Sequence, residues 1–131
     1  MALAVHHLAV LVEDLERAER FYVGLLGLPV LKRWSDDQGA ARSIWVELDG
    51  GFLALERASP GGARRDAMGV GWHLLALRIS ADRRAWWRST LVAAGTAIER
   101  ESPYTLYFRD PDGNLLGLSH HPEAAELEPL R

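Results

Sequence analysis

The sequence predicts an α+β protein built from two tandem βαβββ modules that form a curved mixed sheet around a cleft. Three observations lead to this prediction. Apolar runs of strand length accompany two amphipathic helical stretches, the order of these elements occurs twice, and each half contains an Asp-Gly turn that leads into its last strand. One such module leaves a face of its sheet uncovered, so we expect the second module to complete the fold.

The first module is predicted to span residues 1–58. It opens with an apolar run of strand type at 5–12, and Asp14 can then cap a helix by accepting from its first free backbone amides. Apolar residues recur at helical spacing as far as Gly27, which ends the helix. Three strand-like stretches follow, at 30–34, 42–48 and 52–57.

The second module repeats this order after a linker. Residues 59–71 are rich in glycine and have no periodicity, which predicts the linker. A strand at 72–79 and a helix capped by Ser80 or Asp82 begin the module, which ends at residue 121. Its other strand-like stretches are at 97–101, 104–109 and 114–120. The acidic residues 122–131 are predicted to be a tail or a short terminal helix.

Composition excludes several classes of function. The 131 residues suffice for one compact domain, and the net charge of −3 without a basic stripe argues against a nucleic-acid partner. No apolar run approaches the roughly 20 residues that a membrane span needs. Cysteine is absent, so there is no disulfide framework and no thiol chemistry. We therefore expect a cytoplasmic protein without a membrane partner.

Three stretches carry a family resemblance. The segments "HHLAVLVEDLERAERFYVGLLGLPV", "WHLLALRIS" and "YFRDPDGN" together resemble the vicinal oxygen chelate superfamily, over about residues 5–120. This superfamily includes glyoxalase I, methylmalonyl-CoA epimerase, extradiol dioxygenases, and the fosfomycin and bleomycin resistance proteins. The resemblance implies a glyoxalase-like fold of paired βαβββ modules, a homodimer and a small-molecule substrate or ligand.

The resemblance also implies a site for one divalent metal ion, Fe, Mn, Ni or Zn. Carried over residue by residue, His7 and His73 match the histidine ligands, and Glu56 matches a glutamate that is also a candidate for proton transfer. Two imidazoles and a carboxylate form a familiar arrangement for such ions. However, Gly117 stands where the family usually has its final glutamate, so the alternative is a protein that binds no metal.

Strand alternation predicts which side chains share a face. If His7 faces the cleft, His6 points away from it, and Phe52 shares a face with Glu56. Gly117 removes a side chain from the predicted cleft wall and leaves room for a ligand. The expected lining consists of four aromatic residues and two small ones: Trp45, Phe52, Tyr104, Phe108, Gly117 and Ser119.

Two functions remain open from the sequence. The first is a divergent metal-dependent lyase, isomerase or dioxygenase that acts on a small oxygen-rich substrate. The two histidines and Glu56 favour this function. The second is a metal-free protein that binds an aromatic drug or natural product in a tryptophan-lined cleft. The missing glutamate and the five tryptophans favour the second function.

Overall fold

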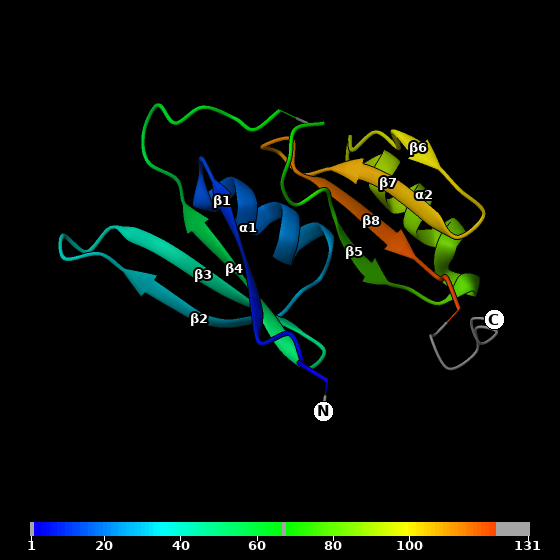
Figure 1. The fold of residues 1–131 in the computed structure, drawn as a ribbon, viewed down its shortest axis with the longest axis horizontal. Helices are drawn as coiled ribbons and strands as arrows, with labels where there is room; N and C mark the ends of the chain where they lie inside the picture. Colours follow the sequence, from blue (N-terminus) through cyan, green and yellow to red (C-terminus); the bar gives the residue numbers. More distant parts are fainter. Residues whose placement is uncertain (1, 67, 123–131) are drawn as a thin grey trace. The chain divides into compact units, whose positions relative to one another are not determined.

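The computed structural model describes residues 2–66 and 68–122, and the chain divides into two compact units, Met1–Gly69 and Val70–Arg131. Each unit contains a four-stranded mixed sheet and a helical segment (Figure 1). The α+β class and the two-module organisation predicted from the sequence are confirmed. Within the described residues, no helix is long and apolar enough to cross a membrane.

The first unit follows the predicted βαβββ order. Its helix begins after Asp14, whose carboxylate accepts from the backbone N–H of Arg17 at 3.1 Å, and it continues as a π-helix before ending at Gly27, which has a φ of 76°. The elements are β1 (His7–Val12), α1 (Leu15–Glu19), η1 (Arg20–Leu25), β2 (Val30–Ser35), β3 (Ala41–Leu48) and β4 (Gly51–Arg57).

The order of strands in this first sheet is β1-β4-β3-β2, and β1 runs parallel to β4. Alternate residues of β4, Leu53 and Leu55, are almost fully buried, and so are Phe21 and Tyr22 of the helical segment. The contacts of α1 with β3 and β4 place the helix against this face of the sheet. Among the described residues, no helix of this unit packs on the opposite face.

The second unit repeats the topology. Its elements are β5 (Leu75–Arg78), the 3₁₀ turn η2 (Ala81–Arg83), α2 (Arg84–Ala93), β6 (Arg100–Glu101), β7 (Thr105–Arg109) and β8 (Leu115–Ser119). The strand order is β5-β8-β7-β6, and β5 runs parallel to β8. Leu91 of α2 is fully buried, as are Leu106 and Phe108 of β7, and these residues belong to the core of this unit.

The Asp-Pro-Asp-Gly-Asn turn between β7 and β8 is held by its first residue. The buried carboxylate of Asp110 accepts from the backbone N–H groups of Asp112 and Asn114 and from the side-chain amide of Asn114, all at 2.8–2.9 Å. Gly113 has a φ of 88°, a backbone conformation that glycine adopts at no steric cost. The motif therefore has a structural role that orients β8.

Several expected strands are shorter in the structure. The strand expected at 72–79 begins only at Leu75, the one expected at 97–101 is reduced to Arg100–Glu101, and the first strand begins at His7. Ser80 takes the N-cap position of η2, but its side chain forms no capping hydrogen bond. The tail expected at 122–131 lies outside the described residues except for Pro122.

Candidate ligand-binding face

The face of the first sheet that lies opposite α1 carries the four residues of this unit that were predicted for the site, His7, Trp45, Phe52 and Glu56. We call it the open face. Register and alternation assign its members from all four strands: His7, Ala9 and Leu11 from β1, Phe52, Ala54 and Glu56 from β4, Ser43, Trp45 and Glu47 from β3, and Lys32 and Trp34 from β2.

An aromatic row crosses the open face from one edge of the sheet to the other. His7 stacks on Phe52 with ring centroids 4.7 Å apart and an interplanar angle of 4°, and Phe52 stacks on Trp45 at 4.4 Å and 24°. Trp34 continues the row at 5.3 Å from Trp45, and the ammonium of Lys32 lies 3.9 Å from the Trp34 ring centroid. The rings therefore order one another before any ligand arrives.

Two buried polar atoms beside this row have no partner. Among the described residues, nothing hydrogen-bonds to the hydroxyl of Ser43, which is only 2% exposed, or to the indole Nε1 of Trp34. Ser43 pairs directly with Trp34 on one side and with Glu56 on the other. The open face thus offers an unpaired hydroxyl, an unpaired N–H donor and a half-buried carboxylate in one row across the sheet.

The predicted site did not include Ser43, although the sequence contains a signal for it. Ser43 stands two residues before Trp45 in the same strand, so alternation alone places the two side chains on one face. Trp45 and Phe52, both expected to line the ligand site, lie on the open face and are half-buried.

The predicted metal ligands of the first unit do not converge. His7 pairs with Phe52, whereas Glu56 pairs with Leu11, which lies four residues further along β1. At about 3.3 Å per residue, the backbone positions of His7 and Glu56 are therefore roughly 13 Å apart along the strands. Donor atoms on one ion lie within about 3–4 Å of each other. Among the described residues, no group of three or more His, Asp or Glu side chains is arranged to hold a metal ion.

The second unit supplies no carboxylate at the expected place either. Gly117 of β8 is buried, and a Cβ atom built on it would lie 3.0 Å from Cγ2 of Thr105 and 3.8 Å from Cβ of Ala76. The space that we expected a ligand to fill is therefore taken by the Thr105 methyl group. His73 is exposed and lies in the segment before β5. Within the part of the chain that the structure describes, neither unit by itself provides a three-ligand metal centre.

The other residues predicted to line the cleft differ in their placement. Ser119 is half-buried, and its hydroxyl accepts from Oγ1 of Thr105 at 2.9 Å. Tyr104 precedes β7, is 42% exposed, and packs edge-on against His120 and His121. Phe108 disagrees with its expected role, because it is fully buried and alternation places it on the face opposite Tyr107 and Gly117.

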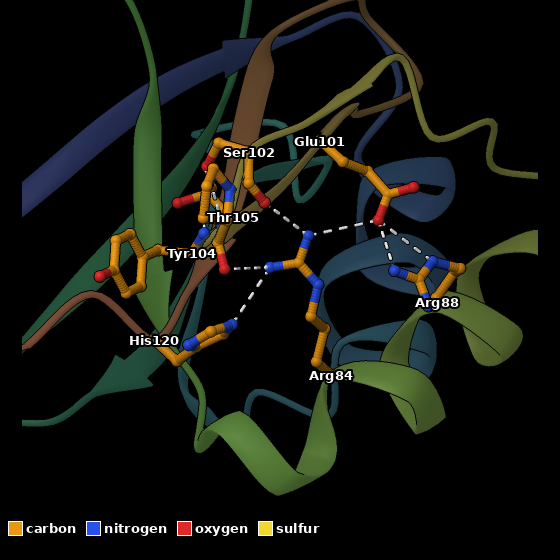
Figure 2. A network of polar contacts seen from close by, with 8 residues as sticks. Arg84, Arg88, Glu101, Ser102, Tyr104, Thr105 and His120 are labelled. Carbon is orange, nitrogen blue, oxygen red and sulfur yellow. Dashed lines mark hydrogen bonds and ion pairs between the residues drawn. The ribbon is translucent and has the colours of Figure 1, made fainter.

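A polar network binds the start of α2 to the turn between β6 and β7 (Figure 2). The guanidinium of Arg84 donates to the backbone oxygens of Ser102 at 2.7 Å and Pro103 at 3.2 Å, and it lies 3.3 Å from Glu101. Arg88 reaches the same Glu101 carboxylate at 2.5 Å. The hydrogen bond from Arg88, and then that from Arg84, lowers the pKa of Glu101.

His6 does not lie where alternation predicted it. Its Nδ1 atom is 2.8 Å from Nδ1 of His7, and the two rings meet edge to face with centroids 5.1 Å apart. The reason is that β1 begins at His7, so His6 precedes the strand and the alternation rule does not govern it. The sequence therefore gave no signal for this pair.

The fold has close counterparts among solved structures. A glyoxalase/dioxygenase from Nostoc punctiforme is 24% identical with a TM-score of 0.77, and the alignment covers 92% of each chain. A mutant of the fosfomycin resistance protein FosX from Listeria monocytogenes, complexed with Mn(II) and 1S,2S-dihydroxypropylphosphonic acid, is 16% identical with a TM-score of 0.76, covering 98% of this chain and 100% of that one.

FosX from Mesorhizobium loti is 16% identical with a TM-score of 0.73, covering 95% of this chain and 97% of that chain. No curated protein matches the sequence. The family described as Glyoxalase/Bleomycin resistance protein/Dioxygenase superfamily matches residues 4–118, which is most of the chain. With the repeated βαβββ topology, this match shows that the chain belongs to the Glyoxalase/Bleomycin resistance protein/Dioxygenase superfamily.

Proposed function

We propose that this protein binds an organic small molecule on the open face of its N-terminal sheet. The observation that carries the proposal is the hydroxyl of Ser43, which is buried between Trp34 and Glu56 and has no hydrogen-bond partner among the described residues. A buried polar group without a hydrogen bond costs about 1–3 kcal/mol. A ligand that supplies the missing partner removes this cost, so the free protein is prepared for a polar group at this position.

The aromatic row supports the same proposal. Its rings are already ordered by stacking, so a ligand meets them with little further loss of side-chain freedom. Their edges and the exposed ring of His7 offer apolar contact, and the Nε1 atom of Trp34 offers a donor. Among the described residues, the Glu56 side chain has no hydrogen-bond or ion-pair partner, so it is available to a donor group of the ligand.

A metal-dependent enzyme is the second candidate. It is favoured by His7 and His73, which stand at equivalent places in the two modules, and by the FosX relative that is complexed with Mn(II). Such an enzyme is a lyase, an isomerase or a dioxygenase, and Glu56 is the residue we assign to proton transfer. Among the described residues, neither unit by itself holds three ligands for such an ion.

We also propose a homodimer in the cytoplasm. Among the described residues, β1 is an edge strand of the first sheet and β5 is an edge strand of the second. An open sheet edge favours pairing with another chain. The absence of cysteine fits a reducing compartment. Light scattering at tens of micromolar protein tests the assembly, and a monomeric mass at that concentration contradicts it.

The test of binding uses bleomycin, a panel of planar aromatic compounds and fosfomycin, each with and without Mn(II). Tryptophan fluorescence and thermal unfolding are recorded for the wild type, Ser43→Ala and Trp45→Leu. Trp86→Leu is the matched control, because Trp86 lies on α2 and outside the open face. A metal-independent thermal shift that both open-face variants reduce, and the control keeps, supports the binding function.

The outcomes separate the two candidates. Binding of fosfomycin only in the presence of Mn(II), lost in His7→Ala and unaffected by Ser43→Ala, supports the metal-dependent enzyme instead. Ligand binding that Trp86→Leu weakens as much as Trp45→Leu contradicts the assignment of the open face.

A further inference from the structure

We propose that the ligand of the open face presents a planar cyclic amide, a lactam, with its carbonyl oxygen at Trp34 and its N–H at Glu56. This inference rests on the binding function proposed above and names the chemical class of the ligand. Pyridones, quinolinones and oxopurines belong to this class. Recognition of the amide requires no metal ion.

The order of the polar side chains across the sheet carries the inference. Trp34 of β2 pairs with Ser43 of β3, and Ser43 pairs with Glu56 of β4, so these three side chains form one row, which we call the polar row. An indole N–H can only donate, a carboxylate can only accept, and a hydroxyl can do either. A complementary group must therefore present an acceptor at the β2 end of the row and a donor at the β4 end.

The charges at the two ends of the polar row have the same order. The ammonium of Lys32 lies 3.9 Å from the centroid of the Trp34 ring, and the carboxylate of Glu56 stands at the other end. An amide dipole has its negative end at the oxygen and its positive end at the N–H. The orientation that makes both hydrogen bonds therefore also places each end of the amide beside the opposite charge.

Other polar groups match only one end of the row. An ammonium has no acceptor for Nε1 of Trp34 and places a second cation beside Lys32. A carboxylate or phosphonate has no donor and places a second anion beside Glu56. A hydroxyl has both functions on one atom, whereas two strands separated by a third lie about 10 Å apart. The separate oxygen and nitrogen atoms of an amide suit this span better.

The neighbouring row favours an amide that belongs to a flat ring. Trp45 follows Ser43 by two residues in β3 and stacks on Phe52 with ring centroids 4.4 Å apart. Its cross-strand neighbours towards β1 are Ala54 and Ala9, whose side chains end at Cβ. An aromatic lactam thus meets an indole beside the polar row, whereas an open-chain amide gains no stacking contact.

Burial makes the polar row selective. The hydroxyl of Ser43 and Nε1 of Trp34 are buried, so water does not replace a donor or acceptor that a bound ligand lacks. Glu56 is half-buried and, among the described residues, has no hydrogen-bond or ion-pair partner. Its side chain can therefore turn aside to admit a ligand without breaking a bond.

The experiment compares ligands that differ in one group. The compound 2-quinolinone has both amide functions, its N-methyl derivative lacks the donor, and coumarin has an oxygen in place of the N–H. Each is titrated by calorimetry into the untagged full-length protein without added metal. We expect 2-quinolinone to bind at least about tenfold more tightly than the other two, because they lose a hydrogen bond to a charged group. 2-Naphthol and quinoline-2-carboxylate, which represent the hydroxyl and the anion, should also bind more weakly.

Variants assign each end of the polar row. Glu56→Ala should bring the affinities for 2-quinolinone and its N-methyl derivative within about twofold of each other, because the acceptor is gone. Trp34→Phe keeps an aromatic ring but loses the N–H, so it should weaken 2-quinolinone and coumarin by a similar factor. Glu16→Ala is the matched control and should keep the preference, because this exposed carboxylate belongs to α1, which packs on the other face of the sheet. Thermal unfolding confirms that each variant is folded.

The outcomes separate this inference from the binding function. Equal affinity for 2-quinolinone and its N-methyl derivative overturns the inference, and so does a preference that survives in Glu56→Ala. Tighter binding of 2-naphthol or quinoline-2-carboxylate, or no binding of 2-quinolinone, overturns it as well. If all these compounds bind equally, and Ser43→Ala and Trp45→Leu weaken them all, the binding function stands and amide recognition fails alone.

Discussion

Nε2 of His120 lies 3.1 Å from Nη1 of Arg84, so the imidazole accepts a hydrogen bond from a guanidinium that also holds the β6–β7 turn. Because arginine can only donate, His120 carries its proton on Nδ1 in this contact. Arg84 thereby ties the start of α2 to the end of β8 as well as to the turn (Figure 2).

Replacing Arg84 should destabilise the second unit. Its side chain is only 17% exposed, and Arg84→Ala removes the donor for two backbone oxygens and for His120. We expect a loss of about 2 kcal/mol in the free energy of unfolding, measured in urea. Arg88→Ala is the control, because the side chain of Arg88 is 42% exposed and, among the described residues, is bonded only to Glu101. Equal losses in both variants would contradict the role of Arg84.

The stability of the protein should fall as the pH decreases, because two carboxyl groups have lowered pKa values in the folded state. The pKa of Asp36 is lowered by its hydrogen bonds with Arg57 and with the backbone N–H of Ala40, and that of Glu101 by Arg88 and Arg84. A carboxyl group whose pKa is lower in the folded state binds fewer protons there, so it stabilises the protein above its unfolded pKa, here 3.8 or 4.5.

That contribution is lost as the pH falls below these values and through the folded pKa. Glu101→Gln should therefore reduce the drop in melting temperature between pH 6 and pH 3, measured by circular dichroism. Glu47→Gln, which replaces an exposed carboxylate of β3, is the comparison. A drop that stays unchanged in Glu101→Gln would show that this carboxylate does not contribute to acid denaturation.

Adding one methyl group at Gly117 should be costly. The Cβ of Gly117→Ala would lie 3.0 Å from Cγ2 of Thr105, whose hydroxyl is held by Ser119 at 2.9 Å. Such overpacking costs about 1–3 kcal/mol. Thr105→Ser removes the methyl group and keeps the hydroxyl, so the double variant should recover most of the loss. A double variant as unstable as the sum of the single ones would contradict this contact.

Two buried hydroxyl groups should respond in opposite directions. Ser43→Ala removes a hydroxyl without a partner and should leave the ligand-free protein equally stable or stabilise it by about 1 kcal/mol. Thr105→Val removes a hydroxyl bonded to Ser119 and should destabilise by about 1 kcal/mol. Chemical denaturation measures both. A destabilised Ser43→Ala protein would mean that the hydroxyl already has a partner in solution.

The sequence predicts the fold better than it predicts the side-chain geometry. Periodicity and the caps at Asp14 and Gly27 are local signals, and the structure has the elements that they predict. The alternation that groups Phe52 with Glu56 on one face also agrees with the strand register. These features depend only on backbone geometry, which the sequence pattern reflects directly.

The placement of a side chain depends on where its strand begins and on which alternate residues of the strand face the core. The sequence pattern determines neither. The alternation rule does not apply to His6, because β1 starts one residue later. Tyr107 and Phe108 are adjacent aromatic residues, so composition does not show which one faces the core, and it is Phe108. Gly117 suggested free space, but the methyl group of Thr105, distant in sequence and paired in the sheet beside it, occupies that space.

The parallel pairing of the first and last strand in each unit determines how the chain can be cut. β1 lies beside β4 and β5 beside β8, so trimming either end of a unit removes a strand from its sheet and exposes the edge of its core. Such pairings join residues far apart in sequence, which makes folding slow and cooperative. A break in the segment between β4 and β5 severs no strand pair of either sheet. Two separately expressed halves should therefore keep their secondary structure, whereas a fragment lacking β1 or β8 should lose it cooperatively.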